Sequence, residues 1–155
     1  MNLAFIGGGN MASALIGGLV NDGVGTRDFR VVEPMAAQQD SLVSNFPGIG
    51  IFAEATLGAI DGADIVVLAV KPQQMREAAE AIAPFVRDVP VVMSIAAGTR
   101  IADLTAWLGG YPRIVRAMPN APALVGAGVS GAYAPAAVSA ASRKLAGRVL
   151  EAAGA

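Results

Sequence analysis

The sequence predicts an α/β fold, in which a doubly wound, mostly parallel sheet carries helices on both faces. Short apolar, β-branched runs alternate with helix-like segments along the chain, and this alternation is typical of right-handed βαβ units. The composition agrees: 54% of the residues are hydrophobic and only 15% are charged, so most helices must be well buried. A chain of 155 residues has the size of one domain, and we expect residues 1–155 to form a single one.

The first half of the chain shows the alternation most clearly. Each expected strand is short and apolar, and the helices follow turn signals such as glycine, proline or asparagine. We expect strands at residues 3–6, 30–33, 49–52 and 65–70, and helices at 10–21, 35–45, 55–60 and 73–86. The segment Phe46-Pro47-Gly48 ends the second helix, and Pro72 suits the opening of the helix at 73–86. Because Gly17-Gly18 lowers the propensity of the first helix, we expect that helix to pack closely against a neighbour.

The second half is predicted to continue with a strand at 90–95, a helix at about 101–108, strands at 113–117 and 127–134, and a last helix at 136–153. A loop rich in proline and glycine joins the last two strands, so we expect them to be antiparallel strands at the edge of the sheet. The chain ends on a turn of small residues at 152–155, where a further strand would be natural. We therefore expect another segment to follow it.

Composition excludes several classes of function. The net charge is −1 and the eleven basic residues are scattered, which argues against a nucleic-acid surface or a polybasic membrane patch. There is no cysteine, hence no disulfide or thiolate chemistry, and no histidine, the commonest metal ligand and acid–base group. Residues 1–21 are uncharged and long enough to span a bilayer, but they contain five glycines and lack a positive leader region. We expect a cytoplasmic protein without a metal site or a membrane partner.

The first expected strand runs directly into a glycine motif of the form Gly-x-Gly-x-x-Ala. Its residues are Ile6, Gly7, Gly8, Gly9, Asn10, Met11 and Ala12. Gly7 permits a tight turn, Gly9 leaves no side chain between the backbone and a diphosphate, and Ala12 lets the helix approach the strand. The N–H groups of the first helical turn would then face the phosphates. This pattern predicts a Rossmann-like, dinucleotide-binding fold; an ordinary tight turn is the alternative.

Candidate binding residues also follow the later strands, because parallel sheets bind ligands at the carboxyl ends of their strands. Glu33-Pro34 follows the second strand, where a carboxylate accepts hydrogen bonds from ribose hydroxyls and repels a 2′-phosphate. No Arg or Lys follows within the next several residues, so the local sequence favours NAD over NADP. A solvated glutamate is the alternative.

Two further segments are candidates for the nicotinamide end. In Ala69-Val70-Lys71-Pro72, the Lys71 backbone would border the cofactor and its ammonium would approach a phosphate or a substrate carboxylate; a surface lysine before a helix-opening proline is the alternative. Ala96-Ala97-Gly98 leaves room for a flat ring, although a tight helix-entry turn would have the same composition.

The stiff loop Met118-Pro119-Asn120 is the candidate substrate end, where Asn120 would present its amide to a substrate or to nicotinamide. An Asx turn is the alternative. A hydroxy-acid dehydrogenase needs a proton acceptor, usually histidine, and neither Tyr111 nor Tyr133 has the lysine four residues later that short-chain dehydrogenases require. Hydride transfer to a protonated imine needs no such group, so the sequence favours imine reduction over alcohol oxidation.

Together these motifs resemble the amino-terminal domain of pyrroline-5-carboxylate reductase, the last enzyme of proline biosynthesis. The resemblance covers the whole chain and rests on residues 5–12, 69–72 and 96–98 and on Arg116-x-Met118-Pro119-Asn120-x-Pro122, in the same order and spacing. It implies that residues 6–11 hold the pyrophosphate, Glu33-Pro34 the ribose, Thr56 the adenine side, Val70, Lys71 and Ala97 the nicotinamide half, and Asn120 the substrate end. It identifies no catalytic residue in this chain.

The chain departs from the family in three respects. Ala121 stands where the family often has threonine, and many members accept NADPH, so the cofactor is expected to be NADP or NAD. In the family, a helical carboxyl-terminal domain follows, forms the homo-oligomer and binds 1-pyrroline-5-carboxylate; no counterpart is present here, so we expect the chain alone to turn over little. The alternatives are a related NADP-dependent reductase, deazaflavin-dependent or of the β-hydroxyacid type, and a non-catalytic nucleotide-binding module.

Overall fold

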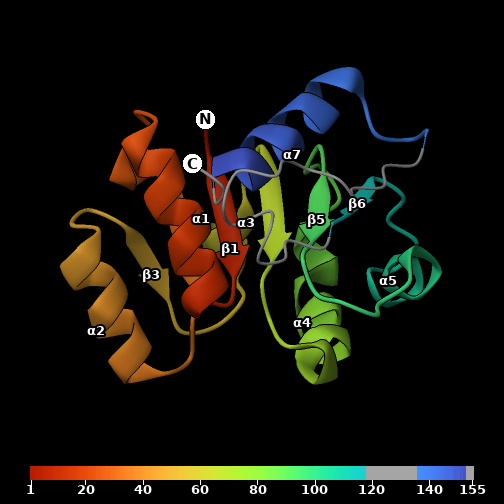
Figure 1. The fold of residues 1–155 in the computed structure, drawn as a ribbon. Helices are drawn as coiled ribbons and strands as arrows, with labels where there is room; N and C mark the ends of the chain where they lie inside the picture. Colours follow the sequence, from red (N-terminus) through yellow and green to blue (C-terminus); the bar gives the residue numbers. More distant parts are fainter. Residues whose placement is uncertain (118–135, 153–155) are drawn as a thin grey trace.

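A computed structural model describes residues 1–117 and 136–152. Six parallel strands form one sheet in the order β3-β2-β1-β4-β5-β6 (Figure 1). The strands are β1 (Leu3–Ile6), β2 (Phe29–Val32), β3 (Gly50–Phe52), β4 (Ile65–Leu68), β5 (Val92–Ser94) and β6 (Ile114–Arg116). The sheet and its helices confirm the predicted Rossmann-like fold.

Helices cover both faces of the sheet, as a doubly wound fold requires. The α-helices are α1 (Asn10–Asn21), α2 (Ala36–Asn45), α3 (Leu57–Ile60), α4 (Met75–Ile82), α5 (Ile101–Trp107) and α7 (Ala140–Ala152). Short 3-10 turns are η1 (Thr26–Asp28), η2 (Pro72–Gln74) and η3 (Ala83–Phe85). One core joins the sheet to α1, α2 and α7, and the other joins it to α3, α4 and α5.

Alternation along the strands divides the two cores. In β1, Leu3 and Phe5 enter the core under α1 and α7, whereas Ala4 and Ile6 enter the core over α4. Successive side chains of a strand point to opposite faces of the sheet, so a strand that is buried on both sides is apolar throughout. This explains why β1 and β4 read as uninterrupted apolar runs in the sequence.

The last part of the sheet differs from the prediction. β6 pairs with β5 in parallel, with Val92 opposite Ile114 and Ser94 opposite Arg116, so the antiparallel edge expected at 113–117 is wrong. The reason is α5, which carries the chain back across the sheet between the two strands and so returns β6 in the same direction. The other strand expected at this edge, 127–134, lies outside the described residues.

Two helices differ from the prediction by more than two residues at one end. The single helix expected at 73–86 is divided into η2, α4 and η3. The α4 helix ends before Pro84, which lacks the N–H that would continue its hydrogen-bond ladder. The last helix begins at Ala140 rather than at 136. The Ser139 hydroxyl accepts a hydrogen bond from the Ser142 N–H at 3.1 Å, which caps the helix at this point.

The close packing expected of α1 is confirmed at Gly18. A Cβ atom there would lie 2.0 Å from the carbonyl oxygen of Ala152 in α7, whereas one at Gly17 would make an ordinary contact, 3.7 Å from the Phe46 ring. The helix therefore needs glycine at only one of the two positions. In the part of the chain that the structure describes, no helix is long and apolar enough to cross a membrane.

Candidate dinucleotide site

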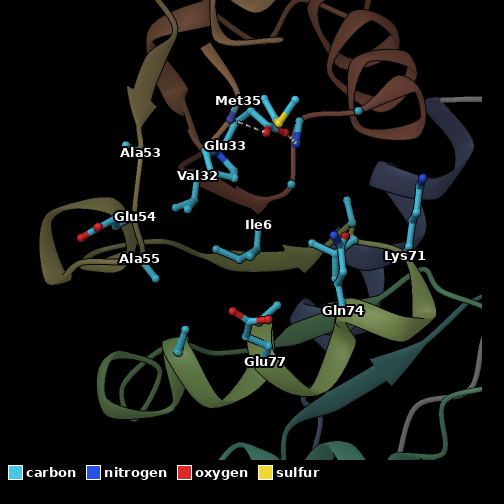
Figure 2. A pocket seen from close by; sticks show the side chains of 18 residues that line it. Ile6, Val32, Glu33, Met35, Ala53, Glu54, Ala55, Lys71, Gln74 and Glu77 are labelled. Atoms are coloured by element: carbon cyan, nitrogen blue, oxygen red, sulfur yellow. Dashed lines mark hydrogen bonds between the residues drawn. The ribbon is translucent and has the colours of Figure 1, made fainter. Parts of the chain in front are cut away.

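A cavity of about 460 Å³ lies at the carboxyl ends of the central strands. The strand order reverses between β1 and β4, and such a switch point is where open α/β sheets bind their ligands. The lining residues, drawn in Figure 2, come from the last residues of β1 and β2, from the loops after β1, β2, β3 and β4, from η2 and from α4. They are Ile6, Gly7, Gly8, Gly9, Val32, Glu33, Pro34, Met35, Ala53, Glu54, Ala55, Ala69, Val70, Lys71, Gln74, Glu77, Ala78 and Ala81.

Gly7 makes the turn that leads out of β1. Its φ is +96°, a value that favours glycine, and its N–H donates to the Val32 carbonyl at 2.8 Å. A Cβ atom at this position would lie 2.6 Å from the carbonyl oxygen of Ala69. The tight turn predicted for Gly7 is therefore present, and it rests directly on the chain leaving β4.

Gly9 has a different environment. It precedes α1 as its N-cap, no side chain caps the helix, and the first turn carries no acidic residue. A Cβ atom added to Gly9 would meet no described heavy atom within 4 Å. The N–H groups of a first helical turn have no partner within their own helix, so the start of α1 offers donors beside open space. Met11 and Ala12 continue the helix, and Ala12 is buried in the core beneath it.

Glu33 is bound at both carboxylate oxygens. Oε1 accepts from the Gly8 N–H at 2.9 Å and Oε2 accepts from the Met35 N–H at 3.0 Å, and the residue is only 8% exposed. The Gly8 N–H is thus already hydrogen-bonded, so the N–H groups that remain free to bind a phosphate are those of the residues after Gly8. Each carboxylate oxygen has two lone pairs, so Glu33 can still accept a hydrogen bond from a ribose hydroxyl; that role stays a prediction.

Two glutamines of α2 complete this arrangement, and the sequence analysis missed both. The Gln38 side-chain amide donates to the Gly8 carbonyl, and the Gln39 amide donates to the Glu33 carbonyl at 2.5 Å. Gly8 is therefore fixed on both sides, at its N–H by Glu33 and at its carbonyl by Gln38. A glutamine pair in the first turns of the helix after an acidic strand end was the available signal.

Lys71 lies at the start of η2, immediately before Pro72 at the first helical position. The Ala69 N–H donates to the Ile6 carbonyl at 2.8 Å, which holds this segment beside the glycine loop. Figure 2 shows Lys71 at the opposite end of the cavity from Glu54. It is exposed, and no ion pair within the described residues engages its ammonium. Its predicted approach to a phosphate or carboxylate fits this place.

Other predicted site residues lie outside the cavity lining. Thr56 is exposed and its hydroxyl accepts from the Ala59 N–H at 3.3 Å, which caps α3 beside Ala55. Ala96 is buried in the core under α5, and Gly98 lies in the turn before α5 with a φ of +81°, a value that favours glycine. These residues, with Ala97 and Asn10, stay predicted contacts. Met118, Pro119 and Asn120 lie outside the described residues.

The sequence analysis also missed the opposite wall. Gln74, Glu77, Ala78 and Ala81 line the cavity from η2 and α4, and their spacing of three to four residues places them on one side of the helix. Ala78 and Ala81 have small apolar side chains, so they take up little space in the cavity beside Gln74 and Glu77. Together with the open space at Gly9 and the uncapped start of α1, this shape fits a dinucleotide: a diphosphate on the loop and a flat ring against α4.

Comparisons with known proteins agree with this geometry. The model of the family described as NADP oxidoreductase, coenzyme F420-dependent, matches residues 2–98. A pyrroline-5-carboxylate reductase of Pseudomonas aeruginosa is 46% identical over 152 residues, which are 98% of this chain and 55% of that protein. The chain spans about half the length of the curated relatives it matches.

Solved structures give the same result. A pyrroline-5-carboxylate reductase from Coxiella burnetii matches with a TM-score of 0.86 at 32% identity, over 99% of this chain and 56% of that one. The Plasmodium falciparum enzyme, solved with NADP bound, matches with a TM-score of 0.78 at 25% identity, over 99% of this chain and 55% of that one. The chain therefore belongs to the family described as NADP oxidoreductase, coenzyme F420-dependent, and it is similar to pyrroline-5-carboxylate reductases.

Proposed function

We propose that this chain is the dinucleotide-binding part of a reductase that converts 1-pyrroline-5-carboxylate to L-proline with a hydride from NADPH or NADH. The observation that carries the proposal is the cavity at the β1/β4 switch point, where open space above Gly9 meets the uncapped start of α1. The similarity to reductases of this name supports the choice of substrate.

The residues of the site would divide the work of binding. The amides after Gly8 would hold the diphosphate, Glu33 would accept from the ribose, and the backbone at Val70 and Lys71 would border the nicotinamide. The dinucleotide supplies the hydride. The protein contributes orientation and proximity, and a protonated imine needs no side-chain acid, in keeping with a sequence that contains no histidine.

The remaining parts of the proposal concern the whole enzyme. We place the substrate end at Met118, Pro119 and Asn120, and we propose that a second, helical domain completes the substrate site and the homo-oligomer. The fact that the relatives are about twice as long as this chain supports that arrangement. The expected cytoplasmic location belongs to the same proposal.

The test is a substrate panel on the full-length enzyme that carries this chain. With NADH and with NADPH, nucleotide oxidation and proline formation are measured on 1-pyrroline-5-carboxylate, on β-hydroxyacids and on a deazaflavin. We expect equimolar nucleotide oxidation and proline only with the cyclic imine. A form that binds the nucleotide but turns over only the deazaflavin or a hydroxyacid would contradict the proposal, and tight binding without any turnover would indicate a nucleotide-binding module.

A further inference from the structure

We infer that this site selects NAD(H) over NADP(H), because the adenosine end of the cavity carries built-in negative charge and no cation. The inference rests on the proposed dinucleotide function and specifies its cofactor. It depends on Glu33, on Glu77 across the cavity, and on the places of the basic residues.

The charge of Glu33 is held in place by the fold. Both carboxylate oxygens accept backbone N–H groups, from Gly8 and Met35, and the side chain is almost completely buried. Turning the carboxylate away would leave two N–H donors without an acceptor, which is costly in a buried site. A nucleotide on the glycine loop must therefore place its ribose beside a fixed anion.

A second carboxylate faces this end from the opposite wall. Figure 2 shows Glu77 of α4 pointing into the cavity toward Ile6, whereas Glu54 at the rim points away from it. A ribose 2′-hydroxyl can donate a hydrogen bond to a carboxylate. A 2′-phosphate has only acceptor oxygens when it is fully ionised, and it carries between one and two negative charges near neutral pH, so it meets repulsion where the hydroxyl meets an acceptor.

The sequence supplies no cation to offset this repulsion. All eleven basic residues lie in the part of the chain that the structure describes, and Lys71, at the other end, is the one that lines this cavity. Arg30, on β2, makes its hydrogen bonds outside the cavity, since its guanidinium donates to the carbonyls of Gly58 and Asp61 at 2.9 and 2.7 Å. Residues 118–135 contain neither Lys nor Arg.

The expected size of the preference follows from Coulomb's law. Two unit charges about 5 Å apart in a water-like medium weaken binding by a factor of roughly four, and a lower effective dielectric constant increases that factor. With up to two charges on the phosphate and a fixed carboxylate beside it, we expect the unphosphorylated nucleotide to bind at least about tenfold more tightly. Salt should narrow this ratio, because it screens the repulsion.

The test measures binding without catalysis. Calorimetry at constant ionic strength gives the dissociation constants of ADP-ribose and of its 2′-phosphate for the wild type and for Met35→Arg, with Met35→Gln as the control of similar length and no charge. Met35 lines the cavity beside Glu33 and is 64% exposed, so the new side chain meets little steric hindrance, and circular dichroism verifies the fold. We expect Met35→Arg to tighten binding of the 2′-phosphate about tenfold, which removes most of the difference in affinity between the two ligands. Met35→Gln should leave that difference unchanged.

A second pair of variants tests the opposite wall. Glu77→Gln should reduce the ratio of the two dissociation constants about threefold. Glu80→Gln should leave that ratio unchanged, because Glu80 is exposed, pairs with Arg76 at 3.5 Å and does not line the cavity. Equal binding of the two ligands by the wild type, or tighter binding of the 2′-phosphate, would overturn the inference and leave the dinucleotide site intact. Failure of both ligands to bind would overturn the proposed site itself, and the inference with it.

Discussion

Alanine at Gly7 and alanine at Gly9 separate the two tasks of the glycine loop. At Gly7, φ is +96° and a Cβ atom would lie 2.6 Å from the Ala69 carbonyl oxygen. A left-handed backbone costs an L-residue about 1–2 kcal/mol, and forcing a methyl group against fixed backbone costs typically about 1–3 kcal/mol. Gly7→Ala should therefore lower the free energy of unfolding by about 2–5 kcal/mol, or the melting temperature by roughly 4–20 °C.

At Gly9 the expected result is the reverse. The backbone there is extended and an added Cβ atom meets no described heavy atom within 4 Å, so Gly9→Ala should change the free energy of unfolding by less than about 1 kcal/mol, the size of an N-cap effect. The methyl group would occupy the space proposed for the diphosphate, and we expect the affinity for ADP-ribose to fall at least about tenfold.

The assays are urea unfolding followed by circular dichroism and calorimetric titration with ADP-ribose. The structure requires that Gly7→Ala lowers the stability of the protein and that Gly9→Ala does not. It also requires that Gly9→Ala lowers the affinity for ADP-ribose. If Gly9→Ala bound ADP-ribose as the wild type does, the diphosphate would not lie over this residue, and the account of the loop would be refuted.

Three further predictions concern the elements around the site. In urea unfolding, Gly18→Ala should destabilise the protein by about 1–3 kcal/mol because its methyl group meets the Ala152 carbonyl, whereas Gly17→Ala should stabilise it by up to about 1 kcal/mol. Equal effects of the two substitutions would refute the α1–α7 packing. Glu33→Ala should lower the free energy of unfolding by about 2–4 kcal/mol because the Gly8 and Met35 amides lose their acceptor, and Glu33→Gln should lower it less. An unchanged stability of Glu33→Ala would contradict these two hydrogen bonds. Burial raises the pKa of Tyr111 to about 12, above its ordinary value of about 10, so its contribution to stability is complete below pH 10 and is lost as the pH rises toward 12. Absorbance at 295 nm should show a late-titrating tyrosine that Tyr111→Phe removes, and titration of both tyrosines near pH 10 would contradict it.

Much of the site was predictable because its signals are local. The motif from Gly7 to Ala12 directly follows an apolar strand, and its spacing predicts both the turn and the start of the helix. The same holds for Pro72, whose place at the first position of η2 follows from its missing N–H. These features depend on residues close together in the chain.

The features that escaped prediction depend on contacts between distant residues. The Gly8 N–H and the Glu33 carboxylate are 25 residues apart, and no local pattern shows that Glu33 accepts a hydrogen bond from this amide. The direction of β6 was missed for a similar reason. A short apolar run does not reveal its partner, and the expected pairing with 127–134 concealed the crossover through α5.

The central claim is that the amides after Gly8 receive the diphosphate of a dinucleotide, and an NMR titration of the ¹⁵N-labelled chain tests it most directly. The account predicts that ADP-ribose shifts the amide signals of Gly9, Asn10 and Met11 strongly and saturably, and that AMP, which has no diphosphate, shifts them much less. The Gly8 signal should stay near the low-field position of an amide that donates a hydrogen bond to Glu33. Saturable shifts confined to residues away from this loop, or none at millimolar ADP-ribose, would contradict it.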